Sequence, residues 1–395
     1  MDYSLYIHVP FCTHRCAYCD FNTYAGQEHS IPEYIDALCK EIEFLGWKQG
    51  SDPIRVHTIF FGGGTPSLFS PEQYASVLQG IRTHFALEEN AEVTMEANPG
   101  TVTFDNLNQF RALGINRISL GVQSANTEEL RMLERIHGFL DVIAAVSAAR
   151  KSGFKNLNLD LIYGLPGQTL KTWQITVKRI LDLYPDHISA YALTLEHGTP
   201  FGRWSARGLL PILDPDLAAE MYEWASEAFE SAGYVQYEIS NWSKHNYQCN
   251  HNLQYWRGLP YLGLGAGAHG YANGFRYSNV LRIKTYIDRL QAIRYLQNGS
   301  QASNFNFPLS PAVVNQHRQT REDDMSEFMI TGLRLTHEGI SFSVFHQRFG
   351  LKANEVYQAE IDELTKLGLV EDSRDILRLT KRGRLLGNQV FLRFV

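Results

Sequence analysis

The sequence predicts an α/β fold: a partial (β/α)6 barrel followed by a small C-terminal winged-helix-like α+β domain. Two observations in the first half of the chain predict the barrel. Short runs rich in β-branched and aromatic residues alternate with segments of helical periodicity, which is the pattern of a parallel sheet with crossover helices. Glycines and polar residues follow the ends of these runs, where parallel barrels collect their active sites. A doubly wound sheet satisfies the alternation equally, but this placement favours the barrel.

Six strands are expected, at residues 5–9, 57–61, 92–96, 117–122, 158–163 and 188–194. Between them, apolar residues recur at helical spacing, as at Tyr34, Leu38 and Ile42. Ser70 followed by Pro71 predicts the start of another helix, because serine caps helices and proline suits the first turn.

The regular alternation stops after residue 233. Residues 240–275 are rich in Asn, His, Tyr, Trp and Gly, which predicts a structured loop region in place of helices or strands. The Gly-rich stretch 263–270 lacks the spacing of a dinucleotide fingerprint, so we expect close backbone packing there. Residues 298–311 are expected to form a linker, because the stretch is polar and holds two prolines.

The C-terminal part has a winged-helix-like order of elements. Helical periodicity around residues 325–335, 342–349 and 356–367 precedes two short strands within 369–379, joined by a polar turn. The expected domain division is therefore 1–235 for the barrel, 236–300 for a binding and connecting segment, and 301–395 for the C-terminal domain.

Charge and hydropathy exclude several classes of partner. The net charge of -6 gives no general attraction to nucleic acid, and residues 321–395 hold eleven Lys and Arg against twelve Asp and Glu. No stretch approaches the ~20 apolar residues of a membrane span, so no integral membrane segment is expected. The first residues lead directly into a strand without the features of a signal peptide, which predicts a cytoplasmic protein.

Three of the five cysteines lie in one short loop, with the spacing Cys12-x3-Cys16-x2-Cys19. Three thiolates can hold three irons of a [4Fe-4S] cluster and leave the fourth iron open to a ligand such as S-adenosylmethionine (SAM). The alternative is a zinc site completed by His8, His14 or Cys249.

Cys39 stands apart from that loop. It belongs to the apolar face of the helix around residues 34–45, where a small buried hydrophobic residue is expected.

These residues resemble the radical SAM superfamily, whose signature CxxxCxxC follows the first barrel strand. Here the signature is preceded by Tyr6-Ile-His-Val-Pro-Phe11, and the turn Gly62-Gly-Gly-Thr-Pro66 matches as well. The resemblance implies a radical SAM barrel with a [4Fe-4S] cluster and bound SAM. We expect the glycine turn to present free backbone N–H and C=O groups to the amino-acid end of SAM.

The whole barrel is similar to the coproporphyrinogen dehydrogenase (HemN) branch of that superfamily. The resemblance implies SAM contacts from Tyr6, Gly63, Gly64, Thr65, Glu96, Gln123, Arg135 and Asp160. The carboxylates can accept hydrogen bonds from an ammonium or from ribose hydroxyls, and Arg135 can pair with a carboxylate. Arg135 is expected on the helical segment that follows Gln123.

A second motif lies downstream, in Cys249-Asn-His251-Asn252-Leu-Gln-Tyr255-Trp256. Its HNxxYW pattern is similar to the haem-binding motif of HemW-type haem chaperones. That resemblance implies that His251 binds haem iron, with Asn252, Tyr255 and Trp256 beside the porphyrin. Without the resemblance, the residues fit a buried His-Asn cluster with aromatic core residues, and Cys249 is either a second ligand or part of the core.

Two features separate this chain from the dehydrogenases. Those enzymes place a further cysteine two residues after the third cluster cysteine, where this sequence has Phe21, and they extend the chain before the Tyr-x-His strand. We therefore predict a haem chaperone that delivers haem to an acceptor protein at the membrane, without coproporphyrinogen dehydrogenase activity. The alternatives are an oxygen-independent coproporphyrinogen III dehydrogenase and a radical SAM enzyme with another substrate.

Overall fold

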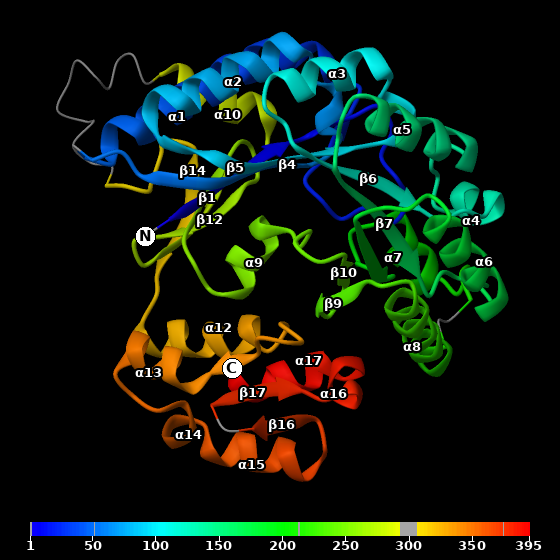
Figure 1. The fold of residues 1–395 in the computed structure, drawn as a ribbon. Coiled ribbons are helices and arrows are strands. Elements are labelled where there is room, and N and C mark those ends of the chain that lie inside the picture. The colour runs from blue at the N-terminus through cyan, green and yellow to red at the C-terminus, as the bar shows by residue number, and fades with distance from the viewer. Residues whose placement is uncertain (1, 51, 212–213, 293–305, 374) are drawn as a thin grey trace. The chain divides into compact units, whose positions relative to one another are not determined.

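The protein is described by a computed structural model that covers residues 2–50, 52–211, 214–292, 306–373 and 375–395 (Figure 1). The chain forms two compact units. The first comprises Met1–Ala225 and Pro260–His317, and the second comprises Ser226–Leu259 and Arg318–Val395.

Six parallel strands form the barrel of the first unit, in the order of the sequence. They are β1 (Tyr3–Val9), β4 (Arg55–Gly63), β5 (Ala86–Ala97), β6 (Arg117–Gln123), β7 (Asn156–Tyr163) and β8 (His187–Ala192). All six expected strands are confirmed, and so is the α/β class with a partial barrel.

Helices connect these strands and lie outside them (Figure 1). They are α1 (Ile31–Lys48), α2 (Pro71–His84), α3 (Phe104–Ala112), α4 (Thr127–Met132), α5 (Phe139–Lys151) and α6 (Leu170–Leu181), followed by α7 (Pro200–Ala206) and α8 (Pro215–Ser231). The expected cap of α2 is confirmed, since Ser70 accepts from the Gln73 N–H and Pro71 occupies the first turn. Cys39 on α1 is half-buried, so it is more exposed than the small buried hydrophobic residue that was expected.

Each barrel strand divides its side chains between two environments. On β7, Leu157, Leu159 and Leu161 are fully buried and face the helices. Asn158 and Asp160 alternate with them and point to the barrel interior. The apolar core therefore lies between strands and helices, and the interior of this strand is polar.

A second set of strands extends the sheet beyond β1. Strand β11 (Tyr261–Leu264) pairs parallel with β1, and β12 (His269–Ala272), β13 (Phe275–Asn279) and β14 (Val313–Arg318) continue outward. Residues 240–275 also contain β10 (Asn241–Ser243) and α9 (Asn250–Trp256). The expectation of a region without helices or strands is thus wrong, because these elements are too short to show a clear period.

The glycines of β11 and β12 allow this close pairing, as expected for residues 263–270. A Cβ atom on Gly263 would lie 1.9 Å from the carbonyl oxygen of His269. A Cβ atom on Gly270 would lie 2.2 Å from the ring of Tyr277. Any larger residue would separate the strands.

Glu41 ties these added strands to the barrel. This fully buried carboxylate on α1 accepts hydrogen bonds from Gly265 N–H, Asn279 Nδ2, Tyr286 Oη and Ser310 Oγ, at 2.6 to 2.9 Å. Tyr286 belongs to α10 (Ile283–Gln291). Residues 298–305 of the expected linker lie outside the described residues, whereas Ser310 is buried and bonded.

The second unit has a winged-helix-like core, as predicted. Its three-stranded sheet has the order β15 (Ile340–Ser341), β17 (Ile376–Leu379), β16 (Val370–Ser373). The helices are α12 (Arg321–Gly332), α13 (Phe342–Phe349), α14 (Ala353–Val356), α15 (Gln358–Lys366), α16 (Lys381–Leu385) and α17 (Gly387–Phe391). The same unit holds α9 and the hairpin of β9 (Val235–Glu238) with β10. Within the described residues, no helix has the length and apolar character needed to cross a bilayer.

Candidate functional site

A cavity of about 490 Å³ opens at the C-terminal ends of the barrel strands in the first unit. It collects side chains from the cysteine loop and from several strand ends, as the barrel prediction requires. Of the predicted residues, ten line it: Cys12, Cys16, Cys19, Gly63, Gly64, Thr65, Glu96, Gln123, Arg135 and Asp160. Tyr6 is not among the described lining residues, and its hydroxyl bonds His8 Nδ1 at 2.9 Å.

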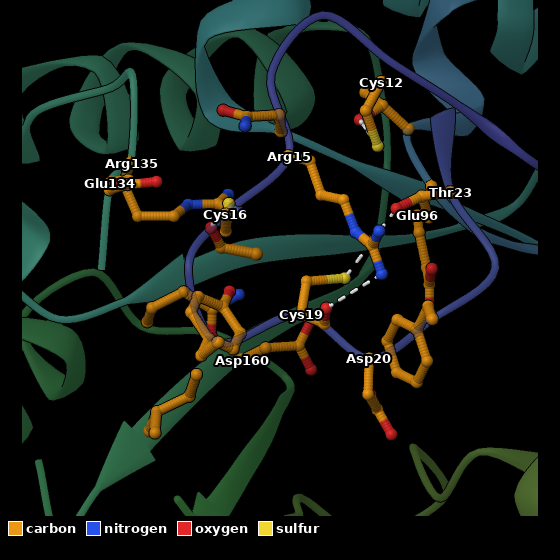
Figure 2. Close-up of a pocket in the computed structure, with 18 of the residues that line it drawn as sticks. Cys12, Arg15, Cys16, Cys19, Asp20, Thr23, Glu96, Glu134, Arg135 and Asp160 are labelled. Carbon is orange, nitrogen blue, oxygen red and sulfur yellow. Dashed lines mark hydrogen bonds between the residues drawn. The ribbon is translucent and has the colours of Figure 1, made fainter. Parts of the chain in front are cut away.

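The cysteine loop is held at both ends by backbone pairing. Cys12 ends strand β2 (Phe11–Cys12), which pairs parallel with β3 (Tyr24–Ala25). Cys19 N–H donates to the Cys16 carbonyl at 3.1 Å, which closes a tight turn between the other two cysteines. Figure 2 shows the three cysteines around the same cavity.

Each cysteine sulfur meets a polar partner. Thr65 Oγ1 lies 3.5 Å from Cys12 Sγ, Arg135 Nη1 lies 3.4 Å from Cys16 Sγ, and Thr23 Oγ1 lies 4.0 Å from Cys19 Sγ. Burial raises the pKa of Cys12 and Cys19, so in the metal-free chain these thiols are protonated at neutral pH.

These surroundings fit an iron–sulfur cluster. Hydroxyl and guanidinium donors stabilise thiolates, which are the ligands such a cluster needs. Among the described residues, no three His, Cys, Asp or Glu side chains converge on one metal ion. A cubane places its three cysteines on three different irons, so it does not require such convergence.

The glycine turn after β4 differs from the expectation. Its N–H groups are used within the protein: Gly63 donates to Glu96 Oε2 at 3.1 Å, Gly64 to Val9 O at 2.8 Å, and Thr65 to Phe11 O at 2.7 Å. The expectation of free N–H groups in this turn is therefore wrong. Position 64 requires glycine because the turn lies close to the backbone of the cysteine loop, and a Cβ atom at this position would lie 2.5 Å from Phe11 O.

Two carboxylates face the cavity from β5 and β7, the strands on either side of β6. Glu96 near the end of β5 and Asp160 on β7 both line it. Burial, and then the nearby Asp160, raise the pKa of Glu96 to about 7, although Gly63 N–H and the Arg117 charge oppose the rise. Burial also raises the pKa of Asp160. The cavity thus holds two buried carboxyl groups whose neutral forms are favoured by burial.

Arg135 supplies the positive charge at this site. It lies in the turn after α4 (Thr127–Met132) and not on a helix, so that expectation is wrong. Its Nη2 donates to Gly121 O at 2.8 Å, and its Nη1 points to Cys16 (Figure 2). Its buried Nε has no hydrogen-bond partner among the described residues, which leaves one donor for a ligand.

Gln123 ends β6 with a φ of 67°, in the left-handed region that non-glycine residues seldom occupy. Such strain at a strand end is common where a side chain must be aimed at a site.

Several cavity residues were missed from the sequence. Arg15 and Tyr18 lie within the cysteine loop itself, and Glu134 precedes Arg135. Arg15 donates to the Cys19 carbonyl at 3.4 Å, and Glu134 lies 3.5 Å from His14 Nε2. Their place beside the signature residues was the signal that could have identified them.

The HNxxYW residues lie in the second unit, on α9. His251 is 1% exposed, and its Nε2 lies 2.7 Å from the Tyr255 hydroxyl, one helical turn away. Trp256 packs under the Arg334 guanidinium, 4.3 Å from the ring centroid. Asn252 is half-buried on the same helix.

Cys249 precedes this helix as its N-cap residue and is fully buried. Its backbone N–H donates to the Tyr237 hydroxyl at 3.3 Å. The side chain thus belongs to the core of this conformation.

Comparison with known proteins extends over the whole chain. Residues 6–180 match the radical SAM superfamily, and residues 319–386 match the HemN C-terminal domain. The chain is 37% identical to "Heme chaperone HemW" of Bacillus subtilis over 393 residues, covering 99% of both chains. It is also 37% identical to "Heme chaperone HemW" of Escherichia coli over 396 residues, covering 99% of this chain and 98% of that one.

Among solved structures, coproporphyrinogen III oxidase (HemN) from Escherichia coli has a similar fold. The TM-score is 0.81 at 25% identity, over 99% of this chain and 89% of that chain.

Proposed function

The chain belongs to the HemW family, with a radical SAM barrel, and we propose that it binds haem and delivers it to an acceptor protein. The observation that carries the proposal is the His251–Trp256 motif, intact on α9 in a chain that matches HemW proteins along its full length. The acceptor is proposed to be a haem protein at the membrane, with the chaperone itself in the cytoplasm. The division into 1–235, 236–300 and 301–395, with haem bound by the middle segment, is part of the same proposal.

Cys12, Cys16 and Cys19 would hold a [4Fe-4S] cluster, with SAM beside it in the 490 Å³ cavity. When bound, this pair supplies one-electron chemistry at an open iron. The protein's part is to bind and orient the ligand. The free Nε donor of Arg135 suits the SAM carboxylate, and the carboxylates of Glu96 and Asp160 suit its ammonium and ribose hydroxyls.

The other proposed SAM contacts have less support from the geometry. Gln123 lines the cavity and can donate or accept. Gly63, Gly64 and Thr65 have committed their N–H groups elsewhere, so their contacts would be through carbonyl, hydroxyl or van der Waals surfaces.

Haem binding would occur at His251, with Asn252, Tyr255 and Trp256 beside the porphyrin. A neutral imidazole ligates iron through one ring nitrogen. Nε2 is paired with the Tyr255 hydroxyl at 2.7 Å, so ligation through Nε2 requires that this hydrogen bond open first.

A second candidate function is coproporphyrinogen III dehydrogenase, because the fold matches HemN with a TM-score of 0.81. The residue at position 21 argues against it. Phe21 is 60% exposed and lines the cavity, at the position where the dehydrogenases carry a further cysteine. We therefore infer that the chain lacks that activity.

One experiment separates the two functions. The cluster is reconstituted anaerobically, and haem binding and coproporphyrinogen turnover are measured on the same sample. We expect one haem per chain, lost in His251→Ala and retained in His245→Ala, an exposed histidine of the same unit. Turnover without haem binding would establish the dehydrogenase and reject the chaperone.

A further inference from the structure

The barrel interior beneath the cavity is polar, which is unusual because parallel barrels normally fill their interior with branched apolar side chains. Arg117, Asn158 and His187 occupy this interior on β6, β7 and β8, and each is at most 2% exposed. None of the three is among the described residues that line the cavity. They are too deep to touch a ligand, so their role must act through the residues above them.

Asn158 connects the interior to the cavity. Its Nδ2 donates to Asp160 Oδ1 at 2.7 Å, while Ser119 Oγ donates to Asp160 Oδ2 at 2.8 Å. Both oxygens of Asp160 are thus held from the interior side by neutral donors. A carboxylate oxygen accepts more than one hydrogen bond, so acceptor capacity is left for a ligand.

His187 fixes the orientation of Asn158. The two atoms His187 Nδ1 and Asn158 Oδ1 lie 2.6 Å apart. Because Asn158 Nδ2 faces the Asp160 carboxylate, Oδ1 must be the atom that faces His187, and His187 Nδ1 therefore carries the proton. Burial, followed by the Arg117 charge, lowers the pKa of His187, which keeps the imidazole neutral.

Arg117 supplies the buried positive charge of this interior. Charges that act on Glu96 come from Arg117 on β6 and Asp160 on β7, with Tyr6 on β1 and Tyr74 on α2 also close enough to interact, and one backbone N–H from β4 donates to it. In the sheet register Arg117 pairs with Thr94, two residues before Glu96 on the same strand. Arg117 is the cation of this set, and its charge lowers the pKa of both Glu96 and Asp160. Without this charge, the two buried carboxyl groups would be harder to ionise together.

We propose that Asn158, His187 and Arg117 are positioning residues for SAM: the first two aim the Asp160 carboxylate into the cavity, and Arg117 favours the charged form of both cavity carboxylates. The inference rests on the proposed SAM site. It assigns the preference of that site for a cationic nucleoside to residues that do not contact the ligand. A ligand with an ammonium group and ribose hydroxyls matches two aimed carboxylates.

The aiming step is tested by SAM affinity, measured calorimetrically on cluster-reconstituted protein. His187→Leu removes the closer of two donors to Asn158 Oδ1, the other being Ser189 Oγ at 3.2 Å, and should weaken SAM binding by about five- to tenfold, the worth of one buried hydrogen bond. His187→Gln restores a donor and should recover most of the affinity. The matched control is Thr94→Val: Thr94 is also fully buried and sits beside Arg117 in the sheet register, and its hydroxyl has no hydrogen-bond partner within the described structure.

The charge step is tested by the pH dependence of the same affinity between pH 6 and 8.5. In Arg117→Met, the midpoint below which binding weakens should move up by about one pH unit, while Arg117→Lys should stay near wild type. A merely structural loss would weaken binding equally at all pH values. The titration of the SAM amino group is common to all variants and cancels in the comparison.

The outcomes distinguish a failure of this inference from a failure of the proposed SAM site on which it rests. Failure of the wild-type protein to bind SAM would reject the proposed SAM site. Suppose instead that the wild-type protein binds SAM. The positioning role alone is then rejected if His187→Leu binds SAM with unchanged affinity, or if the pH midpoints of SAM binding are equal in Arg117→Met and Arg117→Lys. If His187→Leu does not fold, Asn158→Leu replaces it, and SAM affinity at the wild-type level in Asn158→Leu would equally overturn the inference.

Discussion

Removal of the Tyr255 hydroxyl should make haem bind more tightly. Tyr255 and His251 pack edge to face, with ring centroids 4.9 Å apart and the hydroxyl 2.7 Å from Nε2. Whichever atom donates, the lone pair or the proton of Nε2 is committed to this hydrogen bond. Tyr255→Phe keeps the ring and its packing, and it leaves Nε2 available to iron.

The expected gain follows from the energy of that hydrogen bond. A buried hydrogen bond contributes about 0.5 to 1.5 kcal/mol net. Haem ligation in the wild type must first break it, so Tyr255→Phe should lower the haem Kd by about two- to tenfold.

The assay is a titration of the protein with haem, followed by the shift of the porphyrin absorption band. Tyr247→Phe is the control, because Tyr247 lies in the turn before α9 and should leave the Kd unchanged. Weaker haem binding in Tyr255→Phe would mean that the hydroxyl contacts haem directly, and the reasoning above would be wrong.

Three further predictions concern the first unit. Because the folded pKa of Glu96, about 7, lies above its ordinary value of 4.5, its contribution to stability is present below pH 4.5 and lost as the pH rises through 7. Glu96→Gln should therefore stabilise the SAM-free protein at pH 8 by about 3 kcal/mol in chemical denaturation while weakening SAM binding, and equal stability of the two proteins at pH 8 would refute this. Glu41→Ala leaves four buried donors without their acceptor and should lower the free energy of unfolding by about 3 to 5 kcal/mol. The exposed Glu43→Ala should lower it by less than about 0.5 kcal/mol, and a loss below about 1 kcal/mol in Glu41→Ala would contradict the hydrogen-bond count. Gly64→Ala would place a Cβ atom 2.5 Å from Phe11 O, so it should displace the cysteine loop and reduce the cluster iron per chain by more than about half. Gly198→Ala, with open space around it, should keep the iron content, and full iron content in Gly64→Ala would disprove the clash.

The barrel was predictable because its signals are local. Each strand is a short β-rich run, each helix has its own period, and the cysteine spacing is confined to one loop. Parallel strands end at one edge, so Glu96 and Asp160 could be placed together without any knowledge of contacts between side chains.

The remaining features depend on partners distant in sequence. Strand β11 is recognisable only through its pairing with β1, and the N–H groups of the glycine turn are occupied by carbonyl groups of the cysteine loop. Arg135 follows a helix that ends at Met132, a boundary that the sequence pattern does not mark. The HNxxYW motif is compatible with the hydrogen bond between His251 and Tyr255 but does not require it.

The pairing of β1 with β11 also bears on how the chain is made. Strand β1 is complete at residue 9, yet its second neighbour begins at Tyr261, so one edge of the first strand stays bare until most of the polypeptide has left the ribosome. A bare parallel edge invites pairing with other chains, and contacts so distant in sequence form slowly. A fragment that stops after β8 should therefore aggregate although it contains every strand of the barrel.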